Sequence, residues 1–187
     1  MEINRQILND LSSQQKKEIF ELCLRNDFNV PDIWGVLYNQ LYRPLVKKFN
    51  LTKRQIKQMD ENITGRNQVY LANVLFRIEN NKIVGFCIFE IPNAPQINPN
   101  TMCFISYLFV SPEFRRRGIG RELVKDAIEM YMVVKTTIKL MFQKEYELQL
   151  EVEEDNIPLI EFYKSAGFNI GERVRLNKKW HIKMLIN

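Results

Sequence analysis

The stretch SPEFRRRGIGREL, residues 111–123, holds four arginines and two of the chain's seven glycines. The apolar run MCFISYLFV before it (residues 102–110) has the length of a buried strand. After it, apolar residues recur at helical spacing from Ile119 to Val134. Glycines between a strand and a helix free backbone N–H groups to face an anion, and arginines provide bidentate partners for phosphate oxygens. The stretch therefore predicts a phosphate-binding turn at the N-terminus of a helix.

Two common nucleotide-binding loops do not fit this turn. The sequence contains no GxxxxGK[ST] pattern, which excludes a P-loop. The dinucleotide pattern GxGxxG fails because Leu123 stands where the third glycine after Gly118 and Gly120 would be. An ordinary strand-to-helix turn with surface arginines is the simpler alternative. The compound that binds here therefore has to be inferred from the rest of the chain.

The other elements predict a mixed α/β or α+β domain. The first sixty-odd residues have helical periodicity, and the hairpin that follows turns at Glu79-Asn80-Asn81. Three prolines indicate a loop over residues 92–100. The remaining predictions are hairpin strands at 69–78 and 82–91, a strand at 146–152, a helix at 158–166 and closing strands at 168–176 and 180–186.

Composition narrows the class of protein. The chain has 187 residues, of which 45% are hydrophobic, as in one ordinary globular domain. Three widely spaced cysteines without a CxxC pair, and a single histidine, indicate no metal site. The start MEINRQ has no secretory pattern and no apolar run is long enough to span a bilayer, so we expect a soluble, intracellular, cytoplasmic protein. A net charge of +5 suits a nucleic acid or a small polyanionic cofactor equally.

Two blocks of the sequence resemble signatures of the GNAT superfamily of N-acetyltransferases. YLFVSPEFRRRGIGRELVKDAI resembles the acyl-CoA-binding block, because Arg115, Gly118 and Gly120 fill its pattern [Q/R]-x-x-G-x-[G/A]. LQLEVEEDNIPLIEFYKSAGF (residues 148–168) resembles a second block in the expected order. The residues in register there are Leu150, Val152, Asn156, Tyr163, Gly167 and Phe168. The resemblance covers roughly residues 69–186.

The resemblance implies a fold and a domain organisation. It predicts the GNAT fold, an α/β (α+β) arrangement with a mixed, mostly antiparallel sheet splayed at its central strands and flanked by helices. It also implies one GNAT domain over residues 1–187. Within it, residues 1–66 would be a helical substrate-side region and residues 67–187 the acyl-CoA-binding core.

The resemblance also implies acetyl-CoA as the acyl donor and places it on the chain. The pantetheine arm would lie along the backbone of Leu108, Phe109 and Val110 like an added strand. The pyrophosphate would lie on the amides of Arg116, Arg117, Gly118, Ile119, Gly120 and Arg121, with arginine side chains, including Arg115, screening its charge. Asn156 matches a family residue that hydrogen-bonds either the CoA arm or the backbone nearby, and Tyr163 matches the family's tyrosine near the CoA sulfur.

In the chemistry that the resemblance implies, a neutral amine attacks the acetyl thioester directly. Tyr163 matches the tyrosine assigned as the acid for the leaving thiolate, and a backbone N–H near Leu108 or Phe109 would stabilise the oxyanion. A phenol pKa of about 10 is not far above that of a thiol, about 8.5.

The general base is where this sequence departs from the family pattern. Ser106 stands where many members carry a glutamate, and a serine alone is no general base. Three alternatives remain open: a water chain that ends at Ser106 or at a carboxylate such as Glu151, a base from another strand such as Glu90 or His181, or no strong base at all.

The leading hypothesis is therefore an acetyl-CoA-dependent N-acetyltransferase that acts on a primary amine of a small molecule, a polyamine or a peptide or protein. A catalytically weak GNAT-fold module that binds acyl-CoA and regulates or interacts is the alternative. We expect no membrane partner. Because no basic surface interleaved with aromatic residues is visible, we expect no nucleic-acid partner either. The C-terminal strands offer a surface for pairing into a homodimer.

Overall fold

The computed structural model describes residues 4–7, 12, 14, 18, 70–80, 82–92, 102–142, 146–176 and 178–186. The strands are β1 (Asn4–Ile7), β2 (Tyr70–Glu79), β3 (Lys82–Pro92), β4 (Cys103–Val110), β5 (Leu148–Glu153), β6 (Asn169–Leu176) and β7 (Lys179–Ile186). The helices are the 3-10 turn η3 (Pro112–Phe114), α5 (Ile119–Phe142) and α6 (Ile157–Ser165). The predicted hairpin, central strand, long helix, short helix and closing strands are thereby confirmed.

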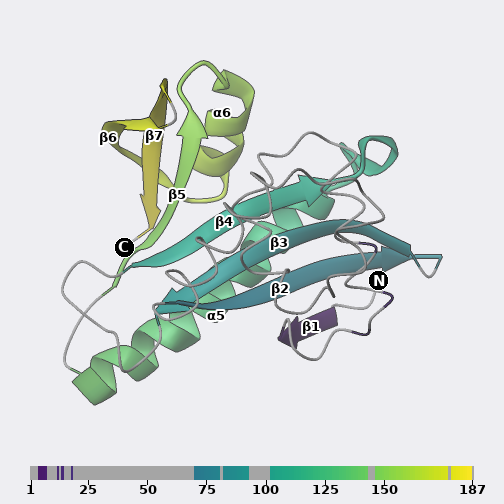
Figure 1. The fold of residues 1–187 in the computed structure, drawn as a ribbon, viewed down its shortest axis with the longest axis horizontal. Coiled ribbons are helices and arrows are strands. Elements are labelled where there is room, and N and C mark those ends of the chain that lie inside the picture. Colours follow the sequence, from purple (N-terminus) through teal and green to yellow (C-terminus); the bar gives the residue numbers. More distant parts are fainter. Residues whose placement is uncertain are drawn as a thin grey trace, which may run out of the picture.

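The described strands form one seven-stranded sheet in the order β1-β2-β3-β4-β5-β7-β6 (Figure 1). Strands β4 and β5 are parallel, and the other neighbouring pairs are antiparallel. This is the mixed, mostly antiparallel sheet that the sequence predicts.

Strand β1 was not anticipated, because the sequence analysis assigned residues 1–66 to a helical region. Its residues pair antiparallel with β2, from Asn4 opposite Phe76 to Ile7 opposite Asn73. A four-residue edge strand is too short to show a periodicity of its own, and it forms on the free backbone groups of β2. Gln14 and Glu18 are helical, as predicted. The other residues of the predicted helices, and residues 93–100 of the predicted loop, lie outside the described residues.

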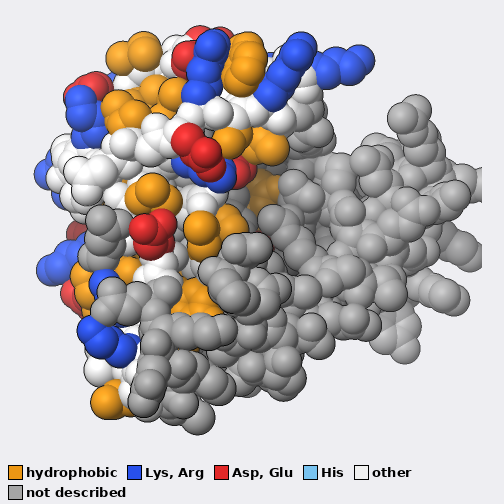
Figure 2. All heavy atoms as spheres, turned by 90° about the vertical axis from the view of Figure 1, so that its left-hand side faces the viewer, with side chains coloured by type: hydrophobic (Ala, Val, Ile, Leu, Met, Phe, Trp, Pro, Cys, Tyr) orange, Lys and Arg blue, Asp and Glu red, His pale blue; other side chains and the backbone are white. Residues whose placement is uncertain are grey.

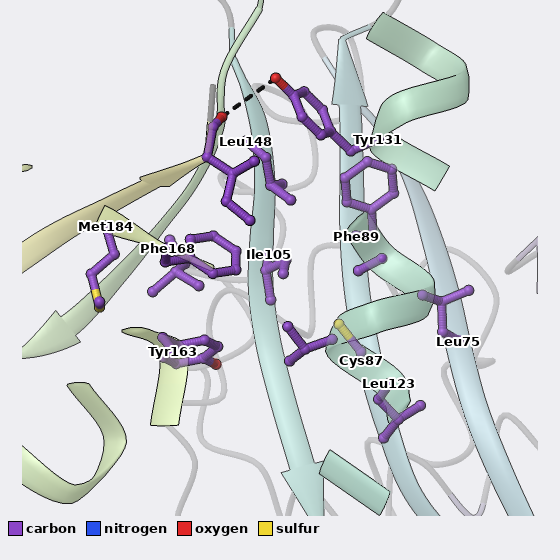
Figure 3. Close-up of a cluster of buried hydrophobic side chains, with 14 of the residues drawn as sticks. Leu75, Cys87, Phe89, Ile105, Leu123, Tyr131, Leu148, Tyr163, Phe168 and Met184 are labelled. Carbon is purple, nitrogen blue, oxygen red and sulfur yellow. Dashed lines mark hydrogen bonds between the residues drawn. The ribbon is translucent and has the colours of Figure 1, made fainter. Parts of the chain in front are cut away.

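The hydrophobic core on the α5 side of the sheet joins the two halves of the fold (Figure 3). Side chains from α5, from strands on both sides of the β4–β5 junction and from α6 meet there. Ten of them are Leu75, Cys87, Phe89, Ile105, Leu123, Tyr131, Leu148, Tyr163, Phe168 and Met184. The Tyr131 hydroxyl donates a hydrogen bond to the carbonyl of Tyr146 at 2.7 Å. This bond satisfies a buried polar group and ties α5 to the segment that enters β5.

The two central strands separate soon after they meet. Only Cys103 opposite Leu148 and Phe104 opposite Gln149 pair across β4 and β5. Beyond this point β4 stays paired with β3, β5 stays paired with β7, and the two halves diverge (Figure 1). The predicted splay of the sheet is thereby confirmed, and it leaves one edge of β4 without a strand partner over residues 105–110 among those described.

A β-bulge in β4 lies just beyond the last β4–β5 pair. Phe89 of β3 lies opposite Ile105, but Ile88 lies opposite Tyr107, so Ser106 is the extra residue. A bulge leaves such a residue out of the ladder and shifts the alternation of side chains. The β4 residues on the α5 side accordingly change from odd to even numbers: Cys103, Ile105, Leu108 and Val110.

Helix α5 is held against β2 by a buried ionic cluster. The Arg77 side chain is 2% exposed and donates to Asp126 Oδ2 at 2.6 Å and to Glu122 Oε2 at 3.2 Å. Asp126 is also buried, whereas Glu122 is partly exposed. Two carboxylates one turn apart on the helix thus compensate one guanidinium in the interior.

Close packing between β3, β4 and α5 requires a glycine at position 85. A Cβ atom there would lie 3.0 Å from the Phe109 carbonyl oxygen and 3.1 Å from Ile119 Cγ2. We expect Gly85→Ala to lower the free energy of unfolding by about 1–3 kcal/mol, because backbone atoms cannot give way as a flexible side chain would. Gly120→Ala is the control for urea unfolding, because its added Cβ meets ordinary contacts at 3.6 and 3.7 Å. Equal stability of the two variants would contradict this packing argument.

Candidate functional site

The turn between β4 and α5 presents a row of backbone amides. Arg116 and Gly118 both have positive φ values, 62° and 84°, which turn the chain sharply into the helix. Helical hydrogen bonding starts with the Glu122 amide, which donates to the Gly118 carbonyl at 3.1 Å. Within the described part of the chain, the amides of residues 116–121 have no backbone acceptor. Such amides, with the positive end of the helix dipole behind them, suit an anion.

The structure holds two of the four arginines of the turn in contacts within the protein. Arg115 donates from Nε to the Val110 carbonyl at 3.0 Å, which braces the end of β4. Arg117 pairs with Glu79 at 2.8 Å and lies 5.2 Å from the centre of the Phe114 ring. These two side chains link the turn to its neighbours, and the expectation that they also screen the charge of the cofactor stays a prediction.

Arg116 and Arg121 are the other two arginines of the turn, and both are exposed. Among the described residues, neither forms an ion pair. Their guanidinium groups are therefore not held by an ion pair within the described part of the chain.

Gly120 marks the point where β4, α5 and α6 converge. A Cβ atom there would lie 3.6 Å from Val110 Cγ2 and 3.7 Å from Phe162 Cζ. The next residue of α6, Tyr163, is therefore carried by a helix that packs directly against the turn. The structure thus brings together the two sequence blocks that resemble the family signatures.

Tyr163 is buried beside two other rings. It lies edge-on to Phe162 and Phe168, with ring centres 5.1 and 5.6 Å away (Figure 3). Burial raises the pKa of Tyr163 above its ordinary value, and nearby Cys87 adds to this shift. The phenol therefore keeps its proton at neutral pH. Among the described residues its hydroxyl has no hydrogen-bond partner, so it is available as a donor to a ligand.

Asn156 hydrogen-bonds to the backbone nearby, which is one of the two roles that the resemblance implies for it. It is the N-cap of α6, and its Oδ1 accepts a hydrogen bond from the Leu159 amide at 3.3 Å. This cap sets the start of the helix that carries Tyr163. The Nδ2 group of the same side chain is left as a donor for a ligand.

Ser106 lies next to a buried carboxylate. Its hydroxyl donates a hydrogen bond to Glu90 Oε1. Glu90 is 2% exposed and lies opposite Phe104, so it is the diagonal neighbour of Ser106 across the β3–β4 ladder. Of the alternatives for the general base, this is the one that the structure joins to Ser106 by a hydrogen bond. The sequence signal for this carboxylate was the position of Glu90 inside the apolar run KIVGFCIFEI, residues 82–91.

The other two candidate bases lie on the β5–β7 half of the sheet. Glu151 is exposed, and Gln149 Nε2 donates to it at 3.4 Å. His181 lies opposite Glu153 at the end of β5 away from the β4 junction, with its Nδ1 3.4 Å from the Lys179 carbonyl. No hydrogen bond joins either of them to Ser106 within the described residues.

Sequence comparison decides the family. The chain matches the acetyltransferase (GNAT) family over residues 37–168. This protein belongs to the GNAT family. Over 96 residues the GNAT chain is 36% identical to an uncharacterized N-acetyltransferase of Methanocaldococcus jannaschii. That match covers 51% of this chain and 38% of the archaeal protein, so the chain spans less than half of that relative's length.

Solved structures show the same fold. An acyl-CoA N-acyltransferase from Pseudomonas aeruginosa matches with a TM-score of 0.57 and 13% identity, over 100% of this chain and 99% of that one. The PaiA N-acetyltransferase from Thermoplasma acidophilum, solved in complex with coenzyme A, matches with a TM-score of 0.52 and 18% identity, over 98% of each chain. The predicted GNAT fold is thereby confirmed.

Two further properties concern only the described residues. They contain no cluster of three histidine, cysteine, aspartate or glutamate side chains that could bind a metal ion. None of their helices is both long and apolar enough to cross a membrane.

On the face shown in Figure 2, basic side chains are interspersed with acidic and hydrophobic ones. In the C-terminal hairpin, Arg173, Lys179 and Lys183 each pair with a glutamate.

Proposed function

We propose that this GNAT protein is an N-acetyltransferase that transfers the acetyl group of acetyl-CoA directly to a primary amine. The observation that carries the proposal is the separation of β4 from β5 beyond Phe104, which is called the opening below. It leaves the edge of β4 without a described strand partner up to the turn that presents the amides of residues 116–121. An extended arm can lie against the free edge of β4 while the phosphates at its end meet the turn. A parallel strand pair that separates after two residue pairs has no evident structural benefit of its own.

The cofactor is proposed to bind in two parts. The pantetheine arm hydrogen-bonds to the backbone of β4 near Leu108, Phe109 and Val110, in the way that a strand adds to a sheet edge. The pyrophosphate accepts hydrogen bonds from the amides of residues 116–121, with the side chains of Arg116 and Arg121 nearby.

The reaction is proposed to proceed by direct attack of the amine nitrogen on the thioester carbon. A backbone N–H near Leu108 or Phe109 stabilises the oxyanion. The Tyr163 hydroxyl donates to the sulfur, so that the thiolate leaves with a proton or a strong hydrogen bond. The acceptor is a primary amine of a small molecule, a polyamine or a peptide, and residues 1–66 are proposed to contribute to its side of a single domain.

Turnover on a panel of primary amines tests the catalytic part of this proposal. We expect Tyr163→Phe to lower kcat by about 100-fold, because it removes the donor to the sulfur. Its stability should change little, since the hydroxyl has no hydrogen-bond partner among the described residues. Tyr131→Phe is the matched control, because it also removes a buried phenol hydroxyl. It should lose about 1 kcal/mol of stability with its hydrogen bond to the Tyr146 carbonyl, and it should keep the kcat of the wild type.

Three outcomes separate the alternatives. Acetyl-CoA binding without turnover on any amine would indicate the catalytically silent module. A kcat for Tyr163→Phe within twofold of the wild type would remove Tyr163 from the mechanism. Absence of binding at millimolar acetyl-CoA would contradict the proposed function as a whole.

A further inference from the structure

We propose that Glu90, acting through the Ser106 hydroxyl, is the group that removes the proton from the acceptor amine. The inference rests on the proposed function. It moves the base from β4, where the resemblance expects it, to the neighbouring strand β3.

The first argument is the contact itself. Ser106 Oγ donates a hydrogen bond to Glu90 Oε1, which fixes the direction of the hydroxyl proton. Glu90 is almost fully buried, at 2% exposed, while Ser106 is only half-buried. The serine hydroxyl therefore stands between the carboxylate and any molecule that approaches Ser106.

The second argument is the position of Ser106 in the sheet. It lies two residues beyond Phe104, the last residue of β4 that pairs with β5. It is also the bulged residue, so its place in the ladder is distorted just where the strands open. Bulges near active sites redirect side chains in this way.

The third argument is the face of the sheet. Phe89 and Ile105 lie in the core on the α5 side. The alternation of β3 therefore puts Glu90 on the opposite face, and its hydrogen bond puts Ser106 there too. Tyr163 belongs to the α5-side core. The proposed base and the proposed acid thus approach the opening from opposite faces, which lets an amine enter on one side while the thiolate is met on the other.

The proton balance is complete with these groups. The ammonium passes one proton to Ser106 Oγ while the proton of that hydroxyl moves to Glu90, which leaves a neutral amine and a neutral carboxylic acid. The amine nitrogen then forms a bond to the thioester carbon, and the carbon–sulfur bond breaks. Tyr163 protonates the thiolate, the second proton of the nitrogen restores the phenol, and Glu90 releases its proton to solvent.

Glu90→Gln tests the inference, measured with an amine that the wild type acetylates. The amide keeps the shape of the side chain and can still accept the Ser106 hydrogen bond, but it cannot take a proton. We expect kcat to fall by about 10²–10⁴-fold for an amine that is protonated at the assay pH. The loss should be much smaller for a weakly basic analogue that is already neutral. A purely structural role would lower both rates equally.

Two serine variants and a surface control accompany this test. Ser106→Ala should lose activity and Ser106→Thr, which keeps the hydroxyl, should retain it. Glu161→Gln removes an exposed carboxylate of α6 that pairs with Lys164, and its rate should equal that of the wild type. Binding of acetyl-CoA, read as a rise in Tm, should be preserved in every variant and shows that each is folded.

Several results would overturn the inference. One is a kcat for Glu90→Gln or for Ser106→Ala within twofold of the wild type. Another is a loss of kcat in Glu90→Gln that is equal for protonated and neutral amines. A third is a loss of kcat in Glu151→Gln in place of Glu90→Gln. Each requires a wild type that turns over, so each leaves the proposed function standing. Absence of wild-type turnover would overturn the proposed function, and this inference with it.

Discussion

Arg77→Ala is expected to lower the free energy of unfolding by about 3–5 kcal/mol, a large part of the stability of a domain. The variant removes the guanidinium from between Asp126, 2.6 Å away, and Glu122, 3.2 Å away. Asp126 would stay buried after losing the positive charge of Arg77, and β2 would lose these two ionic contacts with α5. Urea unfolding of the two proteins measures the difference.

The exposed pair between Arg173 and Glu154 provides the control. Arg173→Ala breaks an ion pair whose partners are 51% and 41% exposed, so it should cost no more than about 1 kcal/mol. The double variant Arg77→Met with Asp126→Leu should recover most of the loss, because it removes the buried charge as well. A single Arg77→Ala variant as stable as Arg173→Ala would show that the cluster does not hold α5 in place.

Gly120→Glu is expected to abolish acetyl-CoA binding while the protein stays folded. In the wild type, acetyl-CoA at 100 times its Kd should raise the free energy of unfolding by about 2.7 kcal/mol. This corresponds to a rise in Tm of about 5–10 °C. The variant should show no rise, because its carboxylate lies at the row of amides proposed to hold the pyrophosphate. The free protein should stay folded, since the added Cβ meets only ordinary contacts and a glutamate suits the first turn of a helix.

A second charge on the same helix separates a local effect from a general one. Thr137→Glu adds a carboxylate at an exposed position of α5 far along the helix from the turn. It should leave the rise in Tm unchanged. A rise in Gly120→Glu equal to that of the wild type would place the phosphates elsewhere.

Local sequence patterns were sufficient to predict the elements from Tyr70 onward. The hairpin turn and the helical stripe from Ile119 are each encoded within a few residues. Strand β1 was missed because its pairing depends on β2, more than sixty residues away. Such a contact leaves no periodic signal in a four-residue segment.

The contacts of the charged residues could not be predicted in the same way. Arg77 lies in an apolar strand, where the sequence alone indicates a solvent-facing arginine. Its partner Asp126 lies on α5, and only the packing of α5 against β2 brings the two side chains together. Arg115 and Arg117 belong to the phosphate-binding pattern, but their contacts with Val110 and Glu79 depend on how the turn packs. The bulge at Ser106, which brings that residue to Glu90, likewise arises from the β3–β4 register.

A crystal structure of the protein with acetyl-CoA tests the central claim most directly. We expect the pantetheine arm to lie between β4, over residues 105–110, and β5, with the strands still paired only at Cys103–Leu148 and Phe104–Gln149. The pyrophosphate should lie within hydrogen-bond distance of the amides of residues 116–121. A cofactor bound away from this opening, or strands β4 and β5 joined by hydrogen bonds beyond Phe104, would contradict the account.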